Sequence, residues 1–272
     1  RYNVVMGYSN QQGLLNVDSN DSMSNLKMDK FNLRTNLDLN LFKFLEAKID
    51  IGGRIENRKS PNYDLGLLMD DLARYPSNIY NVYDDEAGEN FSGTTVYNNN
   101  PVGSIKGLGW QSSRLRILQG NFTLKEKLDF ITPGLYFQQA FSFYSRSRST
   151  YNKTRNYARY FNGRPTTNDQ NTSLVASGYG SDGMDDWKQL MVTLGYSNSF
   201  GKHDINSAVN FHLSDYKGDG KFGYKYHYLN YNGRINYVYD KRYVAELGFS
   251  YFGADSYAPS NRWGLYPALS LG

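Results

Sequence analysis

Hydrophobic and polar residues alternate along much of this chain, and the clearest example is the stretch Phe31–Leu41. Its odd positions carry Phe, Leu and Thr, whereas its even positions carry Asn, Arg and Asp. A period of two residues predicts a β-strand with one apolar and one polar face. About ten alternating residues are enough to cross a lipid bilayer as a tilted strand. Whether this stretch belongs to a membrane protein depends on how often the pattern recurs.

The same alternation recurs along the chain and predicts ten strands. They are Tyr2–Ser9, Phe31–Leu41, Leu45–Asn57, Ser112–Glu126, Leu135–Tyr144, Leu190–Tyr196, Ile205–Ser214, Asn230–Tyr239, Tyr243–Tyr251 and one that starts around Trp263. The apolar side changes midway through Ser112–Glu126, and we expect a β-bulge there. In the long segment Arg58–Gln111, the stretch Asp64–Arg74 is predicted to form a short helix that ends before Pro76.

The connections between these strands alternate between short and long. Short turns are expected near Phe42, Asp129, Gly201 and Asp240. Long polar connections are expected at Asn10–Lys27, Arg58–Gln111 and Arg146–Asp186 and around Asp219. A β-sandwich does not require short and long connections to alternate. An outer-membrane barrel does, because its short turns lie on one side of the membrane and its long loops on the other. The pattern therefore predicts an all-β fold, an antiparallel transmembrane β-barrel segment, which must close because lipid cannot satisfy an open sheet edge.

Composition agrees with a barrel and excludes several other classes of protein. The 272 residues are 39% hydrophobic and 16% aromatic, with 25 Tyr, and the mean hydropathy is −0.65. No apolar run approaches the roughly 20 residues of a membrane helix, which excludes a helical membrane protein but not a barrel with a polar inner face. The formal net charge of +4 is scattered along the chain, which argues against nucleic-acid binding. Cysteine is absent, which excludes disulfides, thiolate metal sites and cysteine nucleophiles.

The sequence contains no motif typical of catalysis, metal binding or cofactor binding, and we expect none of these functions. The three histidines, His203, His212 and His227, have no second ligand at metal-binding spacing. An acidic cluster at Asp84, Asp85, Glu86 and Glu89 could hold calcium, but it lacks the spacing of an EF-hand and is typical of a solvated turn. No nucleophile elbow, phosphate-binding loop or dinucleotide fingerprint is present.

Several segments resemble one family of membrane proteins. The most specific are the run Leu229–Tyr237, the turn Asp240–Tyr243 and the run Ala258–Gly272 with the sequence APSNRWGLYPALSLG. Tyr2–Gly13, Phe31–Leu37 and the loop from Arg74 to Val102 are similar to the same family. Together these segments resemble the barrel of SusC-type TonB-dependent transporters, and the likeness spans the chain.

This resemblance implies a barrel of about 22 strands with an N-terminal plug, which imports oligosaccharides or peptides with energy transmitted through TonB. It also implies a SusD-like surface lipoprotein as a lid over the extracellular mouth. Residues 1–272 are then expected to be part of one such barrel domain in the Gram-negative outer membrane, without the plug and the C-terminal strands. Because the chain starts at Arg1 without a signal peptide and ends at Gly272 inside a predicted strand, we expect it to be an excerpt of a longer precursor.

Solute capture needs aromatic faces for stacking and nearby amides or guanidinium groups for directed hydrogen bonds. The ligand-binding candidates in the long loops are Tyr75, Asn78, Tyr80, Tyr83, Asn98, Asn99, Asn100, Trp110, Tyr157 and Arg159. The alternative role of these side chains is to anchor the loops to one another or to contact the lid lipoprotein. A polar wall facing the lumen is predicted from Arg34, Asn36, Asp38, Lys48, Asp50 and Arg234. The tyrosines at 231, 237, 239 and 243 are expected to form an interfacial girdle.

Two other interpretations of the sequence are open, a small barrel enzyme and a soluble binding module. The chain could be a complete small outer-membrane barrel with surface-protease activity, which would use acidic and histidine side chains at its rim. We find no clear acidic partner for a histidine near a loop end. A soluble multi-stranded binding module would need a second sheet to cover the hydrophobic faces, and nothing in the loop rhythm supports one.

Overall fold

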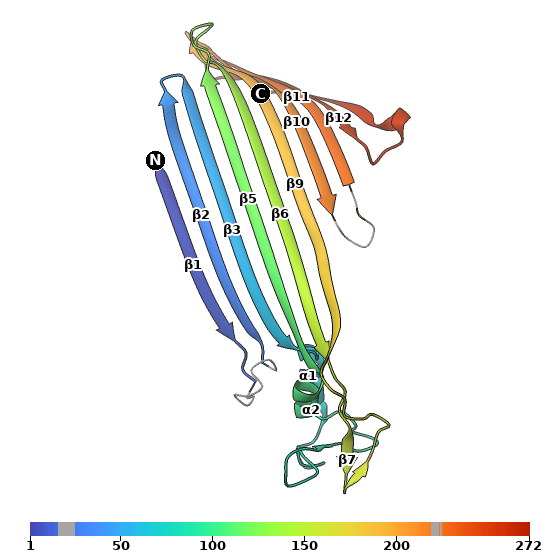
Figure 1. Ribbon diagram of the computed structural model, residues 1–272. Helices are drawn as coiled ribbons and strands as arrows, with labels where there is room; N and C mark the ends of the chain where they lie inside the picture. The colour runs from blue at the N-terminus through green and yellow to red at the C-terminus, as the bar shows by residue number, and fades with distance from the viewer. Residues whose placement is uncertain (16–24, 219–222, 224) are drawn as a thin grey trace.

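The computed structural model describes residues 1–15, 25–218, 223 and 225–272 and is built around one large antiparallel sheet (Figure 1). Its strands are β1 (Tyr2–Gln12), β2 (Lys27–Phe42), β3 (Leu45–Pro61), β5 (Gly109–Lys127), β6 (Leu135–Thr154), β9 (Val175–Phe200), β10 (His203–Gly218), β11 (Lys225–Tyr239), β12 (Tyr243–Ala254) and β13 (Trp263–Leu271). They pair in this order as an up-and-down meander of ten strands, with β1 and β13 at the two edges. The predicted all-β class and the ten alternating segments are confirmed.

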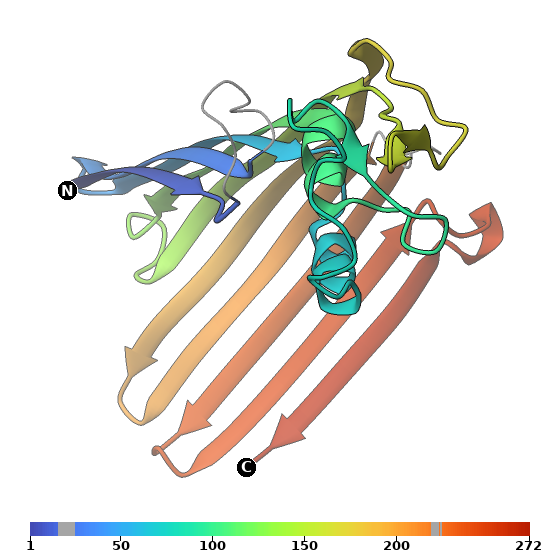
Figure 2. The ribbon, with the colours of Figure 1, turned by 90° about the horizontal axis from the view of Figure 1, so that it is seen from below.

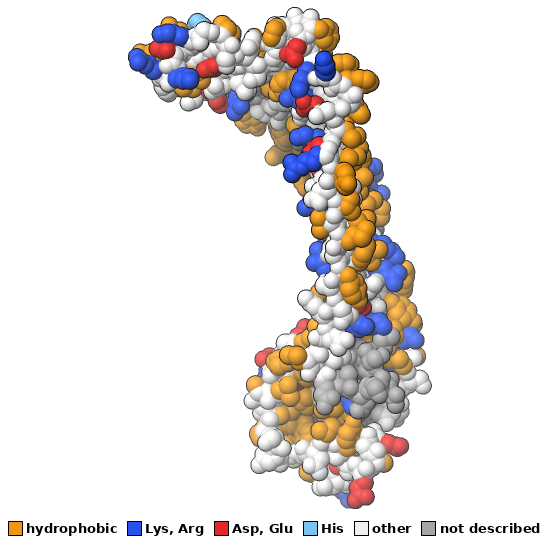
Figure 3. Space-filling view, turned by 90° about the vertical axis from the view of Figure 1, so that its left-hand side faces the viewer, with side chains coloured by type: hydrophobic (Ala, Val, Ile, Leu, Met, Phe, Trp, Pro, Cys, Tyr) orange, Lys and Arg blue, Asp and Glu red, His pale blue; other side chains and the backbone are white. Residues whose placement is uncertain are grey.

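The register of the strand pairs sorts the side chains into two chemically different faces. One row crosses eight strands as Leu37, Ile49, Phe122, Phe141, Leu190, Leu213, Leu229 and Gly253. The adjacent row on the opposite face is Asn36, Asp50, Asn121, Ser142, Gln189, Ser214, Tyr228 and Ala254. We name these the apolar face and the polar face. The sheet is curved, and hydrophobic side chains run along its convex side in the edge-on view of Figure 3.

The apolar face has the height of a membrane-spanning band. On β3 it carries hydrophobic residues or Gly from Leu45 to Ile55. Ten residue steps of about 3.3 Å span roughly 33 Å along the strand, which is a height of roughly 25 Å at a tilt of about 40°. This is about the height of the apolar band on transmembrane barrels.

Short and long connections alternate between the two ends of the sheet, as predicted (Figure 1). Two of the short turns use left-handed backbone, with φ of 59° at Gly201 and of 50° and 56° at Asp240 and Lys241. Such conformations let a tight hairpin follow the twist of its strands. The opposite end of the sheet carries the two longest connections, residues 62–108 and 155–174. The loop predicted around Asp219 lies outside the described residues.

The β-bulge predicted in Ser112–Glu126 is wrong. β5 pairs with both β3 and β6 in continuous register. The apolar side changes because Leu115 and Ile117 lie on the polar face, opposite Glu56 and Arg54 of β3. The hydrophobic ladder on the other face of β5 ends at Leu118, and the strand continues beyond it without distortion.

The loop predicted at Arg146–Asp186 is mostly wrong, because β6 continues to Thr154 and β9 already begins at Val175. These strand ends are rich in Ser, Thr, Tyr and Gly. Beyond the hydrophobic band neither face has to be apolar, so the ladder of backbone hydrogen bonds forms without a period of two in hydrophobicity.

The remaining elements lie in the two longest connections and near the end of the chain. The predicted helix is present as α1 (Leu65–Arg74), whereas α2 (Pro101–Gly107) was not predicted. A small second sheet contains β4 (Phe91–Ser92), β7 (Arg159–Phe161) and β8 (Arg164–Pro165), and a 3-10 turn covers Pro259–Asn261. In the part of the chain that the structure describes, no helix is long and apolar enough to span a membrane.

Candidate functional site

The two longest connections pack together into one unit, which we name the loop cluster and define as residues 62–108 and 155–174. It projects from the ends of β3, β5, β6 and β9 (Figures 1 and 2). In the edge-on view it lies at the lower end of the molecule and leans toward the concave side of the sheet (Figure 3). The cluster therefore lies beyond the end of the sheet, on the side of the polar face.

Asn100 is the centre of the polar network that holds the loop cluster together. Only 1% of Asn100 is exposed. Its Nδ2 donates to the carbonyl oxygens of Val82 at 2.8 Å and Ser92 at 2.9 Å. Its Oδ1 accepts from the backbone N–H of Gly103 at 3.0 Å, which caps the first turn of α2. One side chain thus ties three segments of the first long connection together.

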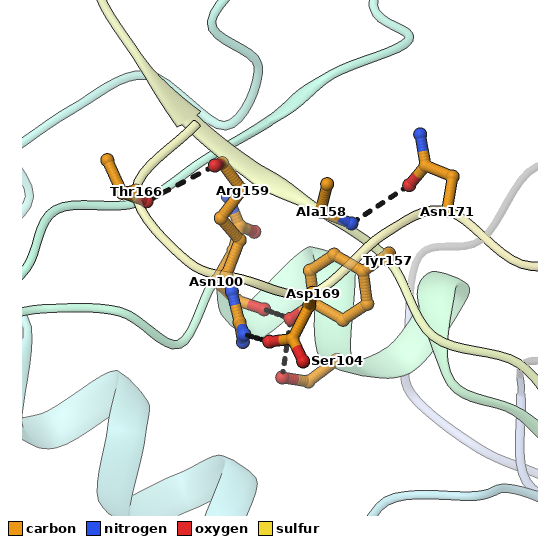
Figure 4. A network of polar contacts seen from close by, with 8 residues as sticks. All are labelled: Asn100, Ser104, Tyr157, Ala158, Arg159, Thr166, Asp169 and Asn171. Atoms are coloured by element: carbon orange, nitrogen blue, oxygen red, sulfur yellow. Dashed lines mark hydrogen bonds and ion pairs between the residues drawn. The ribbon is translucent and has the colours of Figure 1, made fainter. Parts of the chain in front are cut away.

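Tyr157 joins the second connection to the first by packing on α2. The ring lies so close to Gly103 and Gly107 that a Cβ at either glycine would come within 2.7 Å and 2.4 Å of its carbon atoms. The Tyr157 hydroxyl lies 3.2 Å from Ser104 Oγ and donates to the Asn100 carbonyl at 3.4 Å (Figure 4). Because α2 presents glycines to the ring, the helix and the tyrosine approach as closely as backbone allows.

Further contacts cross between the two connections. β4 and β7 form a parallel pair, and the guanidinium group of Arg159 lies over the Tyr157 ring while it binds Asp169 (Figure 4). The Asp84 carboxylate accepts from the backbone N–H groups of Asn162 at 2.9 Å and Gly163 at 2.7 Å. The cluster is therefore a small folded unit with its own polar network.

Two carboxylates of the acidic cluster that was considered for calcium accept hydrogen bonds from backbone N–H groups. Asp84 makes the two contacts just described, and Asp85 accepts from the N–H groups of Glu89 and Asn90, each at 2.9 Å. Within the described residues, no group of three His, Asp or Glu side chains could hold a metal ion.

Three half-buried tyrosines of the loop cluster have raised pKa values. Burial, followed by the adjacent Asp71 carboxylate, raises the pKa of Tyr63, whose hydroxyl donates to Asp71 Oδ2 at 2.6 Å. Burial raises the pKa of Tyr80 to about 12, and the Tyr80 hydroxyl donates to the Asn99 carbonyl at 2.8 Å. Burial also raises the pKa of Tyr75. The Tyr63 and Tyr80 hydroxyls are therefore held in the neutral form that donates these hydrogen bonds.

We expect the loop cluster to lose stability as the pH rises from about 10 to about 12. The Tyr80 phenol ionises at a higher pH when folded than when unfolded, so the folded state binds more protons above pH 10 and its stability falls there. Hydrogen exchange of residues 62–108 at pH 8 and pH 11 would measure this loss. Replacing Tyr63 and Tyr80 together with Phe should shrink the pH dependence, and an unchanged pH dependence would contradict the assignment.

The structure brings most of the predicted ligand-binding candidates into the loop cluster, but in different environments. Asn100 and Tyr157 are buried, Asn78 and Asn98 are exposed, and Tyr75, Tyr80, Tyr83, Asn99 and Arg159 are half-buried. The aromatic members contact neighbours within the cluster. The Tyr83 ring stacks on Phe91 at 5.2 Å between centroids, and Tyr75 meets Tyr97 edge to face at 5.3 Å. These contacts tie the loops to one another and leave only part of each ring accessible.

Trp110 lies apart from the other candidates. It is the second residue of β5, and the register places it on the apolar face opposite Lys153 of β6. Its ring lies 5.7 Å from the Tyr151 ring, and Lys153 Nζ lies over it at 5.7 Å. Trp110 therefore faces away from the polar face, on the opposite side of the sheet from the predicted wall residues.

All six residues predicted as a polar wall lie on the polar face: Arg34, Asn36, Asp38, Lys48, Asp50 and Arg234. Asn36 pairs with Asp50, and Asp38 pairs with Lys48. Arg234 lies further along the same face, on β11 between Ala208 and Gly248.

Sequence reasoning missed a cavity of about 310 Å³ on the polar face. It is lined by Glu56, Arg58, Ser60, Gln111, Ser113, Leu115, Arg148 and Thr150. The lining combines two guanidinium groups with a carboxylate, an amide and an aliphatic side chain. Arg148 was not predicted as a site residue because it belongs to a segment that was predicted to be a loop, whereas it lies near the end of β6.

The statement that the histidines lack an acidic partner near a loop end is wrong for His227. Its Nδ1 lies 3.3 Å from Asp215 Oδ1, its Nε2 lies 3.9 Å from Asp255 Oδ2, and its backbone N–H donates to Asp255 Oδ1 at 3.0 Å. The partner was missed because Asp215 belongs to the neighbouring strand and pairs with His227 only through the register. The side chain lies on the same face as Leu213 and Leu229, away from the polar face.

No protein-family model matches the sequence, and no curated protein matches it. Among solved structures, the chain is similar to the RagAB peptide transporter, with a TM-score of 0.65 and 16% identity over 98% of this chain and 32% of that one. It is also similar to the RagAB peptide importer in its closed-closed state (TM-score 0.66, 17% identity) and its open-open state (TM-score 0.67, 16% identity). The chain therefore spans about a third of the length of these structures. At such low identity the likeness concerns the fold alone.

Proposed function

We propose that this chain is the wall and part of the external loops of a transmembrane β-barrel in an outer-membrane, TonB-dependent importer of the SusC type. The observation that carries the proposal is the apolar face, which continues across the sheet and has the height of a membrane band. Lipid is the environment that accepts such a face when no second sheet covers it. The alternation of short turns and long connections, the sequence resemblance and the similarity in fold to a peptide transporter support the same assignment.

We assign the solute to peptides or oligosaccharides that move along the polar face. That face offers guanidinium, carboxylate and amide groups, and its cavity joins Arg58 and Arg148 with Glu56. These groups can form directed hydrogen bonds with peptide bonds, carboxylates or sugar hydroxyls. The loop cluster lies at the end of this path, where an incoming solute and a SusD-like lipoprotein would meet it. Energy would be supplied through TonB by a part of the protein outside this chain.

A small barrel with protease activity is the competing function. It would need acidic and histidine side chains that act on a substrate at the rim. His227 and Asp215 form such a pair, but they lie on the apolar face rather than on the polar face or in the loop cluster. That position favours the importer.

Membrane location can be tested on the intact protein. We expect it to fractionate with the outer membrane and to need detergent for extraction. In gel electrophoresis, the unheated protein should migrate faster than the heated protein, as a folded barrel does. A monodisperse protein that stays in solution without detergent would sink the proposal.

Loop variants test the solute assignment separately. We expect Tyr80→Ala to weaken binding of a fluorescent mixture of eight- to twelve-residue peptides, or of glucose oligomers, by about fivefold, because one aromatic contact of this kind contributes roughly 1 kcal/mol. Trp110→Ala is the comparison, since its ring lies on the opposite face. Trp110→Ala should bind both probes as the wild type does. If Tyr80→Ala does so too, Tyr80 is not part of the solute site.

A further inference from the structure

A basic groove lies on the apolar face at the edge of the hydrophobic band, on the side of the long connections. Its volume is about 510 Å³. The side chains that define this basic groove are Lys59, Arg114, Arg116, Asp29, Tyr151 and Tyr179. The register explains its position. Arg116 pairs with Ile55, the last hydrophobic residue of the band on β3, and Arg114 pairs with Asn57 two residues further along. The cations therefore begin where the aliphatic ladder ends.

The groove carries more positive than negative charge. Asp29 is its one acidic side chain, and that carboxylate already accepts from the Tyr8 hydroxyl at 3.0 Å and from Asn10 Nδ2 at 2.5 Å. Arg114 Nε donates to Asn57 Oδ1 at 2.7 Å, which aims its guanidinium group without neutralising it. Within the described residues, the Arg116 side chain makes no hydrogen bond or ion pair and is exposed. Three cations therefore face one acid that has its own partners.

The surface directly beside these cations is aliphatic and aromatic. Leu118 is 50% exposed, Ile55 is 44% exposed and Phe31 is 44% exposed, and all three lie on the same face as Arg116. A ligand that fits both parts must have an anionic head and apolar chains. Guanidinium groups bind phosphate oxygens by charge-assisted, often bidentate hydrogen bonds. The chemistry matches a phosphorylated lipid better than a soluble anion.

The two ends of the apolar face differ in a way that assigns the leaflet. At the short-turn end, the described strands carry no Lys or Arg on this face. That end instead presents aromatic side chains such as Tyr237, Tyr239 and Tyr243. Aromatic rings suit any lipid interface, whereas grouped cations select anionic headgroups. The selective end is the one that carries the long connections.

We propose that the basic groove binds the phosphorylated headgroup of a membrane lipid in the leaflet on the side of the long connections. Arg114, Arg116 and Lys59 hold the phosphate, and the acyl chains lie on the apolar face over Ile55 and Leu118. This inference rests on the membrane location proposed above, and it adds a lipid site on the side of the sheet opposite the solute path.

The test uses the intact protein in non-ionic detergent and native mass spectrometry. The probes are a diphosphorylated glycolipid, its dephosphorylated counterpart with the same acyl chains, and inorganic phosphate. The double variant Arg114→Gln, Arg116→Gln is compared with Lys48→Gln, Lys125→Gln, which removes the same charge from the polar face. Heat-modifiable migration confirms that each variant is folded.

We expect the double arginine variant to bind the diphosphorylated lipid about tenfold more weakly, because it loses charge-assisted contacts of that strength. The lysine variant should bind like the wild type, the dephosphorylated lipid should bind at least tenfold more weakly, and inorganic phosphate should not compete. Equal binding by both variants, or equal binding of both lipids, would overturn the lipid site. Competition by inorganic phosphate would replace it with a soluble-anion site. Failure of the membrane proposal is recognised separately, since the wild type would then show no heat-modifiable migration.

Discussion

Replacing Asn100 with Ala is expected to destabilise the loop cluster by about 3 kcal/mol while the large sheet keeps its stability. The truncation removes the partners of the Val82 and Ser92 carbonyls and of the Gly103 N–H. Asn100 is almost fully buried, so water cannot readily replace these bonds. The cap of α2 is lost at the same time, and Tyr157, which packs on that helix, loses its support.

Hydrogen exchange measures this effect segment by segment. A loss of about 3 kcal/mol corresponds to a roughly hundredfold faster opening of the cluster, so amides in residues 82–104 and 157–161 should exchange faster while those of β10 to β12 are unchanged. The matched control is Asn98→Ala, because Asn98 is the same residue type and is exposed. Asn100→Asp separates the two functions, since a carboxylate can still cap Gly103 but cannot donate to the two carbonyls.

The outcome also bears on solute capture. If the cluster is the outer part of a solute path, Asn100→Ala should reduce binding of the peptide probe more than Asn98→Ala does. The reason is that the aromatic side chains of an opened cluster are no longer held in position. Exchange rates that are the same in Asn100→Ala and Asn98→Ala would show that the network around Asn100 does not hold the cluster.

The fold could be predicted where one face of a strand must be apolar. From Leu45 to Ile55 every second residue is constrained by its surroundings, so the period of two is visible and the register follows from it. Beyond the band that constraint disappears. The ends of β6 and β9 are held by backbone pairing between residues such as Thr150 and Gly180, which leaves no pattern in hydrophobicity. Beyond the band, Leu115 lies on the polar face. The pattern therefore changes side there and predicted a bulge, although the strand is regular.

The candidate site was less predictable because its contacts join segments that are distant in the sequence. Asn100 and Tyr157 were singled out for their chemistry, but their burial depends on a helix that was not predicted. A signal for α2 was present, since Asn100 is followed by Pro101, and an Asn cap before a first-turn proline is a common helix start. No local signal could have joined Arg58 to Arg148, because only the pairing of β3, β5 and β6 brings them to one cavity.

The apolar face gives the prediction that separates a membrane wall from every soluble alternative. Phe122→Arg is expected to cost the intact protein about 2–4 kcal/mol of stability in a lipid bilayer, the penalty for a cation near the bilayer midplane on a barrel. Phe122 lies near the middle of the apolar ladder of β5, which runs from Leu118 to Leu124, and its ring lies 6.3 Å from that of Phe143. A guanidinium group there cannot reach water without bending toward an interface.

Asn121→Arg is the matched control because the same charge is added one residue away on the polar face. There the new side chain stands opposite Asp50 of β3 and Ser142 of β6, and we expect a change below about 0.5 kcal/mol. Equilibrium unfolding in phospholipid vesicles, followed by the folded band on unheated gels, gives both values. If the apolar face were merely a solvent-exposed surface, Phe122→Arg would be neutral or would improve solubility, and the two variants would be indistinguishable. A large difference between adjacent residues, one on each face, is the result that a sheet with lipid on one side and water on the other requires.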